Sequence, residues 1–153
     1  MEKKVFQNIK SSVDCPVDLV KVDETRVRVV AFFVLVITCW YVLTGAPLLI
    51  GLLLVDFVLR ALNLNNFSPL ALLAGSIVKQ AGLKSRPVDR APKRFAAFVG
   101  IVFLTAILIA CVIHQVGFSR ILAGVIIIFA SLESFAGFCA GCYVYAFINR
   151  FKS

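Results

Sequence analysis

Two cysteines three residues apart are the clearest candidates for chemistry in this chain. In Cys139-Ala140-Gly141-Cys142 both thiols share one face of a helix, at a separation that suits a disulfide with little backbone movement. Such a pair cycles between dithiol and disulfide, carries sulfur as a persulfide, or holds a metal ion. The segment is also typical of close helix packing, because Gly137 and Gly141 form a G-x-x-x-G motif.

The position of this pair limits how reactive the thiols are expected to be. The pair lies near the end of a predicted membrane helix, whereas a helix N-terminus is where the dipole lowers a thiol pKa. We therefore expect no such activation. On a helical wheel Glu133 shares a face with Gly137 and Gly141, and the cysteines point roughly the other way. Glu133 is thus poorly placed as their base unless the glycines distort the helix.

The other three cysteines divide between the two sides of the predicted membrane. Cys15, followed by Pro16, belongs to the same side as Cys139 and Cys142 and could act as an exchanging thiol or as a third ligand of zinc or copper(I). That side is reducing, so stable structural disulfides are not expected there. Cys39 and Cys111 are typical of small apolar core residues, and they are the only candidates for a second, outer pair.

Two acidic residues interrupt the apolar runs and need partners in hydrocarbon. Asp56 precedes Arg60 by four residues, the favourable order for an ion pair along a helix. We predict a buried cluster of Asp56, Arg60 and Glu133 between the second and fourth spans. Such a cluster either fixes the register of the helices or lines a path for a proton or a substrate.

The elements that position these residues are membrane helices. Of 153 residues, 61% are hydrophobic and 16% are charged, with a mean hydropathy of +0.97, which is too apolar for a soluble domain of this length. We predict an all-α integral membrane protein, a single domain with four transmembrane helices and a cytoplasmic interfacial amphipathic helix. The predicted segments are a tail (1–26), spans at 27–44, 46–62, 95–114 and 121–143, an interfacial helix (68–82) and a basic strap (83–94).

The basic residues set the expected orientation. The formal net charge is +8. Fifteen of the sixteen Lys and Arg residues lie on one side of the predicted membrane, in the two termini and the connection between the second and third spans, and Arg120 alone lies in a loop on the other side. Both termini are therefore expected to be cytoplasmic, and nucleic-acid binding is not needed to explain the charge. A polar stretch before the first apolar run argues against a cleaved signal peptide.

Several short motifs occur in a specific order along nearly the whole chain. The motifs are Cys15-Pro16-Val17, Arg26-Val27-Arg28 leading to Ala31-Phe32, Asp56-Phe57 with Arg60-Ala61, Ser68-Pro69-Leu70-Ala71, Ala91-Pro92-Lys93-Arg94-Phe95-Ala96, and Leu132-Glu133 with Gly137-Phe138-Cys139-Ala140-Gly141-Cys142. Together they resemble an uncharacterised bacterial family of small four-helix membrane proteins, a domain of unknown function. The resemblance implies the bacterial inner membrane, and relatives that occur beside thioredoxin-like or rhodanese-like proteins imply thiol or sulfur chemistry.

The leading hypothesis is a membrane thiol-disulfide or persulfide-handling protein, an oxidoreductase if it turns over. Cys139 and Cys142 would react, Cys15 would exchange, and a thioredoxin-like or rhodanese-like cytoplasmic partner would dock on the basic face. Membrane thiol carriers move one cysteine pair between the two faces of the membrane. A homodimer is expected, because four helices in a monomer leave little room for that movement. The alternatives are a small oligomeric transporter or channel lined by the Asp56, Arg60 and Glu133 cluster, and a zinc or copper(I) site; the sequence identifies no cofactor.

Overall fold

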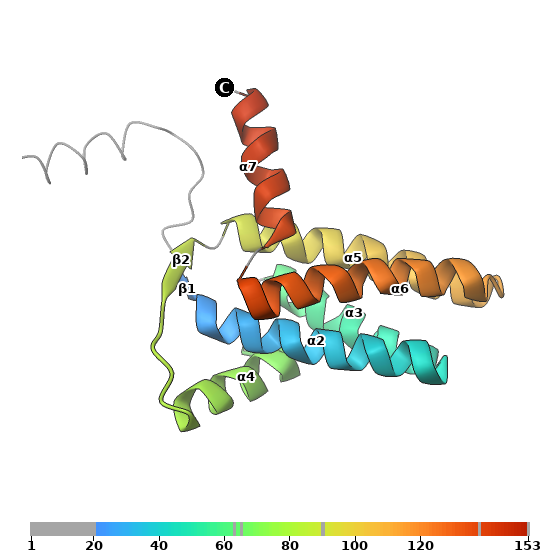
Figure 1. The fold of residues 1–153 in the computed structure, drawn as a ribbon, viewed down its shortest axis with the longest axis horizontal. Helices are drawn as coiled ribbons and strands as arrows, with labels where there is room; N and C mark the ends of the chain where they lie inside the picture. The colour runs from blue at the N-terminus through green and yellow to red at the C-terminus, as the bar shows by residue number, and fades with distance from the viewer. Residues whose placement is uncertain (1–20, 63, 65, 90, 138, 153) are drawn as a thin grey trace, which may run out of the picture.

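Four helices lie side by side in the computed structural model, which describes residues 21–62, 64, 66–89, 91–137 and 139–152. They are α2 (Glu24–Thr44), α3 (Pro47–Ala61), α5 (Ala91–Val112) and α6 (Val116–Ser131). Helix α3 packs on α5, and α2 and α5 both pack on α6. Figure 1 shows the four running along one direction, with α4 (Pro69–Gln80) and α7 (Ala140–Lys152) at one end. This end of the bundle, where α4 and α7 lie, is called the α7 end below.

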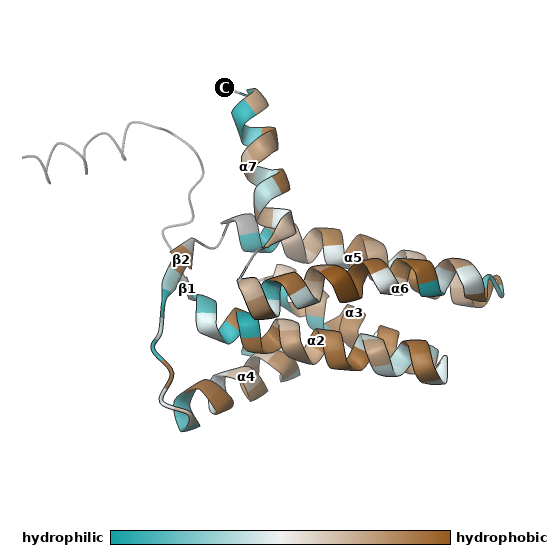
Figure 2. Ribbon diagram, in the orientation of Figure 1, coloured by the Kyte–Doolittle hydropathy of each residue, from teal (hydrophilic) through white to brown (hydrophobic). Residues whose placement is uncertain are grey.

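Three helices among the described residues are long and apolar enough to cross a membrane. They span Glu24–Thr44, Lys93–Val112 and Val116–Ala136. Helix α3 has 15 residues, so its length is about 22 Å and falls short of a hydrocarbon core of about 30 Å. Hydrophobic residues cover most of the bundle, and many hydrophilic ones gather at its α7 end (Figure 2). The chain is therefore an all-α protein with the helices of a membrane protein.

The ends of the first helices follow from local chemistry. Asp23 begins α2 by accepting a hydrogen bond from the backbone of Thr25 at 3.1 Å. Gly45, at a φ of +69°, ends α2, because its N–H donates to Tyr41 and glycine tolerates this left-handed conformation. Pro47 then occupies the first position of α3. The sequence predicted this hairpin at 27–44 and 46–62, within three residues of the observed limits.

A short helix and a two-stranded sheet connect the second and third long segments. Ser68 caps α4 by accepting from the backbone of Ala71 at 3.3 Å, and the helix packs on α2, as its apolar periodicity requires. Strand β2 (Pro87–Asp89), inside the predicted basic strap, pairs antiparallel with β1 (Lys21–Asp23). No strand was predicted for this segment. The pairing ties the strap to the start of α2.

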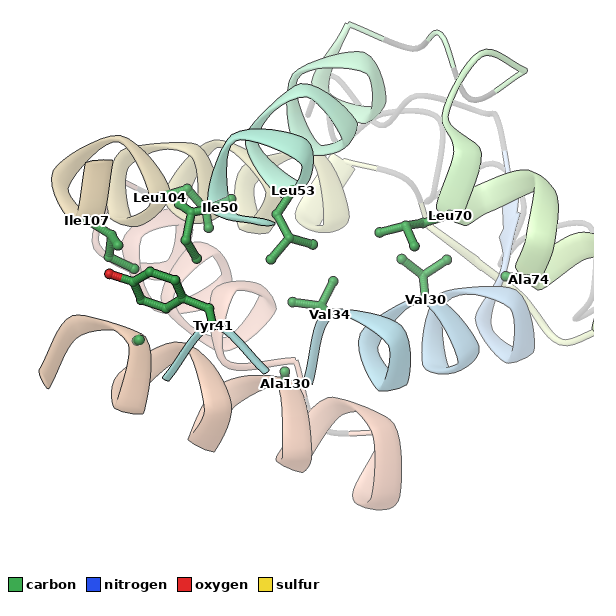
Figure 3. Packing of buried hydrophobic residues seen from close by; sticks show 11 residues of the cluster. Val30, Val34, Tyr41, Ile50, Leu53, Leu70, Ala74, Leu104, Ile107 and Ala130 are labelled. Atoms are coloured by element: carbon green, nitrogen blue, oxygen red, sulfur yellow. The ribbon is translucent and has the colours of Figure 1, made fainter. Parts of the chain in front are cut away.

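The buried core runs along the bundle axis and continues under α4. Figure 3 shows Leu53 of α3 facing Val34 of α2, with Leu70 of α4 next to Val30 and Ile50 of α3 beside Leu104. Ile107 and Leu104 of α5 extend the core toward the other end, where Tyr41 lies. Helix α4 is thus held by side chains that belong to the same core as the long helices.

Candidate functional site

The chain breaks its helical path immediately before the cysteine pair. Helix α6 continues into a π-helical turn, Leu132–Ala136, and ends at Gly137, whose φ is +66°. A new helix, α7, then begins at Ala140 and leads away from the bundle (Figure 1). The predicted continuous span at 121–143 is therefore wrong in its last part, because a left-handed residue cannot continue a right-handed helix.

This break places the two cysteines at a helix N-terminus. The carbonyl of Cys139 accepts a hydrogen bond from the backbone of Tyr143 at 3.2 Å, so Cys139 occupies the cap position of α7. Cys142 follows in the first turn. The pair therefore lies at the positive end of a helix dipole, and the expectation that this activation is missing is wrong.

The two thiols are hydrogen-bonded to each other, and their pKa values shift in opposite directions. The pKa of Cys139 is lowered, chiefly because the thiol of Cys142 donates to its sulfur, and Lys93 acts in the same direction. Burial and the charge of Glu133 oppose this effect. The pKa of Cys142 is raised, first by the same hydrogen bond and then by burial. Cys139 is thus the thiol that ionises first and the better candidate for the nucleophile.

Close packing holds the break in place. A Cβ added at Gly137 would overlap the guanidinium of Arg28 from α2, and a Cβ at Gly141 would come within 2.8 Å of the Ala96 backbone in α5. The rings of Phe95 and Tyr145 also meet, with centroids 5.8 Å apart. The glycines of the predicted G-x-x-x-G motif therefore have different roles: one turns the chain, and the other seats α7 on α5.

Glu133 lies near Cys139 because of the same distortion. The helical wheel placed the two on opposite faces, but that argument assumed 100° per residue through Gly137. With the π-helical turn and the left-handed glycine between them, the thiol of Cys139 lies within hydrogen-bonding reach of the Glu133 carboxyl group. Glu133 is therefore positioned to exchange a proton with this thiol, which the sequence analysis did not expect of a regular helix.

A cavity of about 220 Å³ opens beside Cys139 between α2, α3, α5, α6 and α7. Its polar lining at the α7 end of the bundle consists of Arg60, Lys93, Glu133 and Cys139. The rest of the wall is apolar. It includes Phe57, Phe103, Leu104, Ile126 and Phe129. The cavity thus has a thiol, a carboxyl group and two cationic side chains at one end and is otherwise lined by hydrophobic residues.

Asp56 does not belong to this group. Its side chain is fully buried, and its Oδ1 accepts from the Ser68 hydroxyl at 2.5 Å and from the Leu70 backbone at 3.2 Å. The predicted ion pair between Asp56 and Arg60 is not formed. Instead the Arg60 guanidinium lies over the ring of Phe57, 5.4 Å from its centroid. Of the predicted ionic cluster, only Arg60 and Glu133 line the cavity together.

Cys39 and Cys111 do not join the candidate site. Cys39 is exposed on the outer surface of α2, whereas the sulfur of Cys111 lies 2.9 Å from the Tyr41 hydroxyl. Cys15 lies outside the described residues. Within the described part of the chain no three His, Cys, Asp or Glu side chains are arranged to hold a metal ion.

Two residues of the site were missed from the sequence. Lys93 and Arg28 were used as topology signals and as parts of family motifs, with no role in the site, yet Lys93 lines the cavity and Arg28 lies against Gly137. A lysine at the first turn of a long apolar segment was the available signal for Lys93. No local pattern indicated Arg28, because its contact joins residues more than 100 positions apart.

Comparison with known proteins assigns the chain to a family. Neither a curated protein nor a solved structure matches the chain. A family model described as a domain of unknown function (DUF4395) matches residues 22–150, which include every helix from α2 to α6 and nearly all of α7. The match confirms the resemblance to an uncharacterised family, and the chain belongs to that family, DUF4395.

Proposed function

We propose that this protein is a membrane thiol-disulfide oxidoreductase whose reactive pair is Cys139 and Cys142. The observation that carries the proposal is the place of the pair: Cys139 caps α7, receives a hydrogen bond from Cys142, and lines a cavity with Glu133 and Lys93. A thiolate is the reactive form of cysteine, and a helix N-terminus with a neighbouring cation stabilises it.

The residues divide the work of thiol-disulfide exchange. Cys139 loses its proton to Glu133, and its thiolate attacks a disulfide of the partner, forming a mixed disulfide and releasing one partner thiolate. Cys142 then attacks the sulfur of Cys139, closes the internal disulfide and releases the second partner thiolate. The same Cys139 thiolate can instead attack the outer sulfur of a partner persulfide, which breaks the partner's S–S bond, leaves the persulfide on Cys139 and releases the partner thiolate. Cys15 is the proposed exchanging thiol of the tail.

In this proposal the chain crosses a bacterial inner membrane four times, and both termini lie in the cytoplasm. Helix α3 supplies the fourth crossing together with the turns that flank it. The exposed aromatic face of α7, Tyr143, Phe147 and Phe151, supports a position along the cytoplasmic membrane surface. A thioredoxin-like or rhodanese-like partner would then reach the pair from the basic side.

The transporter alternative loses part of its support. It required Asp56, Arg60 and Glu133 on one path, whereas the hydrogen bonds of Asp56 go to Ser68 and Leu70 of the α4 N-terminus. This arrangement favours a structural role for Asp56.

The test is a count of free thiols in the full chain, purified anaerobically in detergent, before and after a mild oxidant. Peptide mapping by mass spectrometry assigns each thiol. We expect a reversible bond between Cys139 and Cys142, its loss in Cys139→Ser, and no change in the control Cys39→Ser. Inert thiols would overturn the proposal, and stoichiometric zinc or copper in the same preparation would favour the metal alternative.

A further inference from the structure

The exchange of the proposed function is reversible, and in the direction that oxidises a partner dithiol it leaves Cys139 and Cys142 reduced, so the pair then needs an electron acceptor. The described residues offer none inside the protein. Cys39 lies on the exposed surface of α2, and Cys111 is engaged with Tyr41, so these two cysteines form no second pair that could relay electrons outward. The acceptor must therefore reach Cys139 from solution or from the lipid. The cavity beside Cys139 indicates whether the acceptor comes from solution or from the lipid.

The cavity has one polar end and a long apolar wall. On α5 its lining runs from Lys93 to Leu104, eleven residues or about 16 Å, which is half the thickness of a hydrocarbon core. Phe129 and Val144 belong to the lining and are also 43% and 50% exposed, so the cavity reaches the outer surface of the bundle. A molecule dissolved in the lipid can enter there.

The polar end is suited to a ligand with carbonyl oxygens. Arg60 makes neither a hydrogen bond nor an ion pair with any described residue, and it lines the cavity together with Lys93. The charges of Asp56 and Glu133 act on Arg60 without forming an ion pair with it, so its N–H groups are available to a ligand that accepts hydrogen bonds. A volume of about 220 Å³ is enough for one substituted ring, since roughly 150 Å³ admits benzene.

We propose that this cavity binds a membrane quinone and that the quinone oxidises the pair Cys139 and Cys142, an inference that rests on the proposed thiol function. The ring lies beside Cys139, with its carbonyl oxygens accepting from Arg60 and Lys93. The isoprenoid tail follows the apolar wall past Ile126 and leaves beside Phe129.

The reaction balances as a two-electron transfer. The Cys139 thiolate adds to a ring carbon, and the quinone oxygen that becomes negative is stabilised by Arg60 and takes the proton held by Glu133. Cys142 loses its proton and attacks the sulfur of Cys139, which breaks the sulfur–carbon bond and forms the disulfide. The ring keeps both electrons and, with the proton of Cys142, leaves as hydroquinone. Two thiols and one quinone thus give one disulfide and one hydroquinone.

The experiment adds a short-tailed ubiquinone, without oxygen, to the reduced full chain in detergent. We expect one quinone reduced per chain and a mapped bond between Cys139 and Cys142. A matched pair of variants on α6 tests the cavity: Ile126→Phe fills its wall, whereas Ile128→Phe places the same side chain on an exposed position outside it. Ile126→Phe should slow quinone reduction at least tenfold, with Ile128→Phe unchanged.

Two further measurements distinguish a failure of the quinone inference from a failure of the proposed thiol function. Diamide, a soluble thiol oxidant, should close the disulfide in both α6 variants at the wild-type rate. Arg60→Gln, which leaves the apolar wall intact, should also slow quinone reduction about tenfold, the loss expected for one hydrogen bond to a charged group. A disulfide that diamide forms but quinone does not would overturn the quinone inference alone. Failure with both oxidants would overturn the thiol function itself.

Discussion

The hydroxyl of Ser68 lies 2.5 Å from Oδ1 of Asp56 and ties the last turns of α3 to the first turn of α4. Asp56 also accepts from the backbone of Leu70, so a fully buried carboxyl group serves as an additional cap for α4. An acidic residue that a membrane helix buries is often part of a pathway. Here Oδ1 makes both hydrogen bonds to the start of α4, which favours a structural role, whereas Oδ2 is buried with no hydrogen-bond partner among the described residues.

Removing this carboxyl group should destabilise the protein without changing the reactive pair. Asp56→Ala leaves the Ser68 hydroxyl and the Leu70 N–H without their buried acceptor, a cost of about 1–3 kcal/mol in the free energy of unfolding. Asp56→Asn retains an acceptor oxygen and should cost less. Thermal unfolding in detergent measures the difference. If Asp56→Asn were as stable as wild type but lost thiol activity, the structural role would be wrong.

The hydrogen bond between the two thiols gives a prediction for the pH dependence of alkylation. Cys142 stabilises the Cys139 thiolate by donating to it, so Cys142→Ala should raise the pKa of Cys139 and shift its alkylation profile to higher pH. Cys142→Ser keeps a donor and should shift the profile less. The rate of iodoacetamide labelling of Cys139, followed by mass spectrometry across pH, checks both variants. Identical profiles for the two variants would exclude the hydrogen bond as the cause.

The charges beside Cys139 should act in opposite directions. Lys93 favours the thiolate, so Lys93→Gln should raise the pKa of Cys139. Glu133 disfavours the thiolate, so Glu133→Gln should lower this pKa while removing the proton acceptor. The same labelling experiment resolves the two signs. A shift in the same direction for both variants would mean that general unfolding of the site, rather than charge, controls the thiol.

The left-handed turn at Gly137 should be sensitive to a single methyl group. Gly137→Ala places a Cβ in a conformation that costs roughly 1–2 kcal/mol and against the Arg28 guanidinium. Gly45→Ala is the matched control, because Gly45 has a similar φ of +69° with nothing within 4 Å of the added Cβ. We expect the larger loss of stability at Gly137, and a change in Cys139 labelling there alone. Equal losses would show that the Arg28 contact contributes nothing.

The helix limits near the first loops could be predicted because local residues decide them. Asp23 and Ser68 cap their helices, Pro47 and Pro69 begin theirs, and Gly45 ends one, each through interactions within a few residues. The region around Gly137 could not be predicted in this way. Residues 121–149 form one apolar run with Glu133 as the single charge, and a glycine inside a membrane helix usually indicates packing rather than an end.

The sequence by itself determined that the chain is a bundle of apolar helices with basic residues at one end, since hydropathy and charge are properties of each segment alone. The tertiary structure decided where the chemistry lies. Arg28 against Gly137 and Ala96 against Gly141 join segments far apart in the chain, and they set the break that brings Cys139 to a helix N-terminus beside Glu133. Such contacts exist only once the helices have packed, so no local pattern contains them.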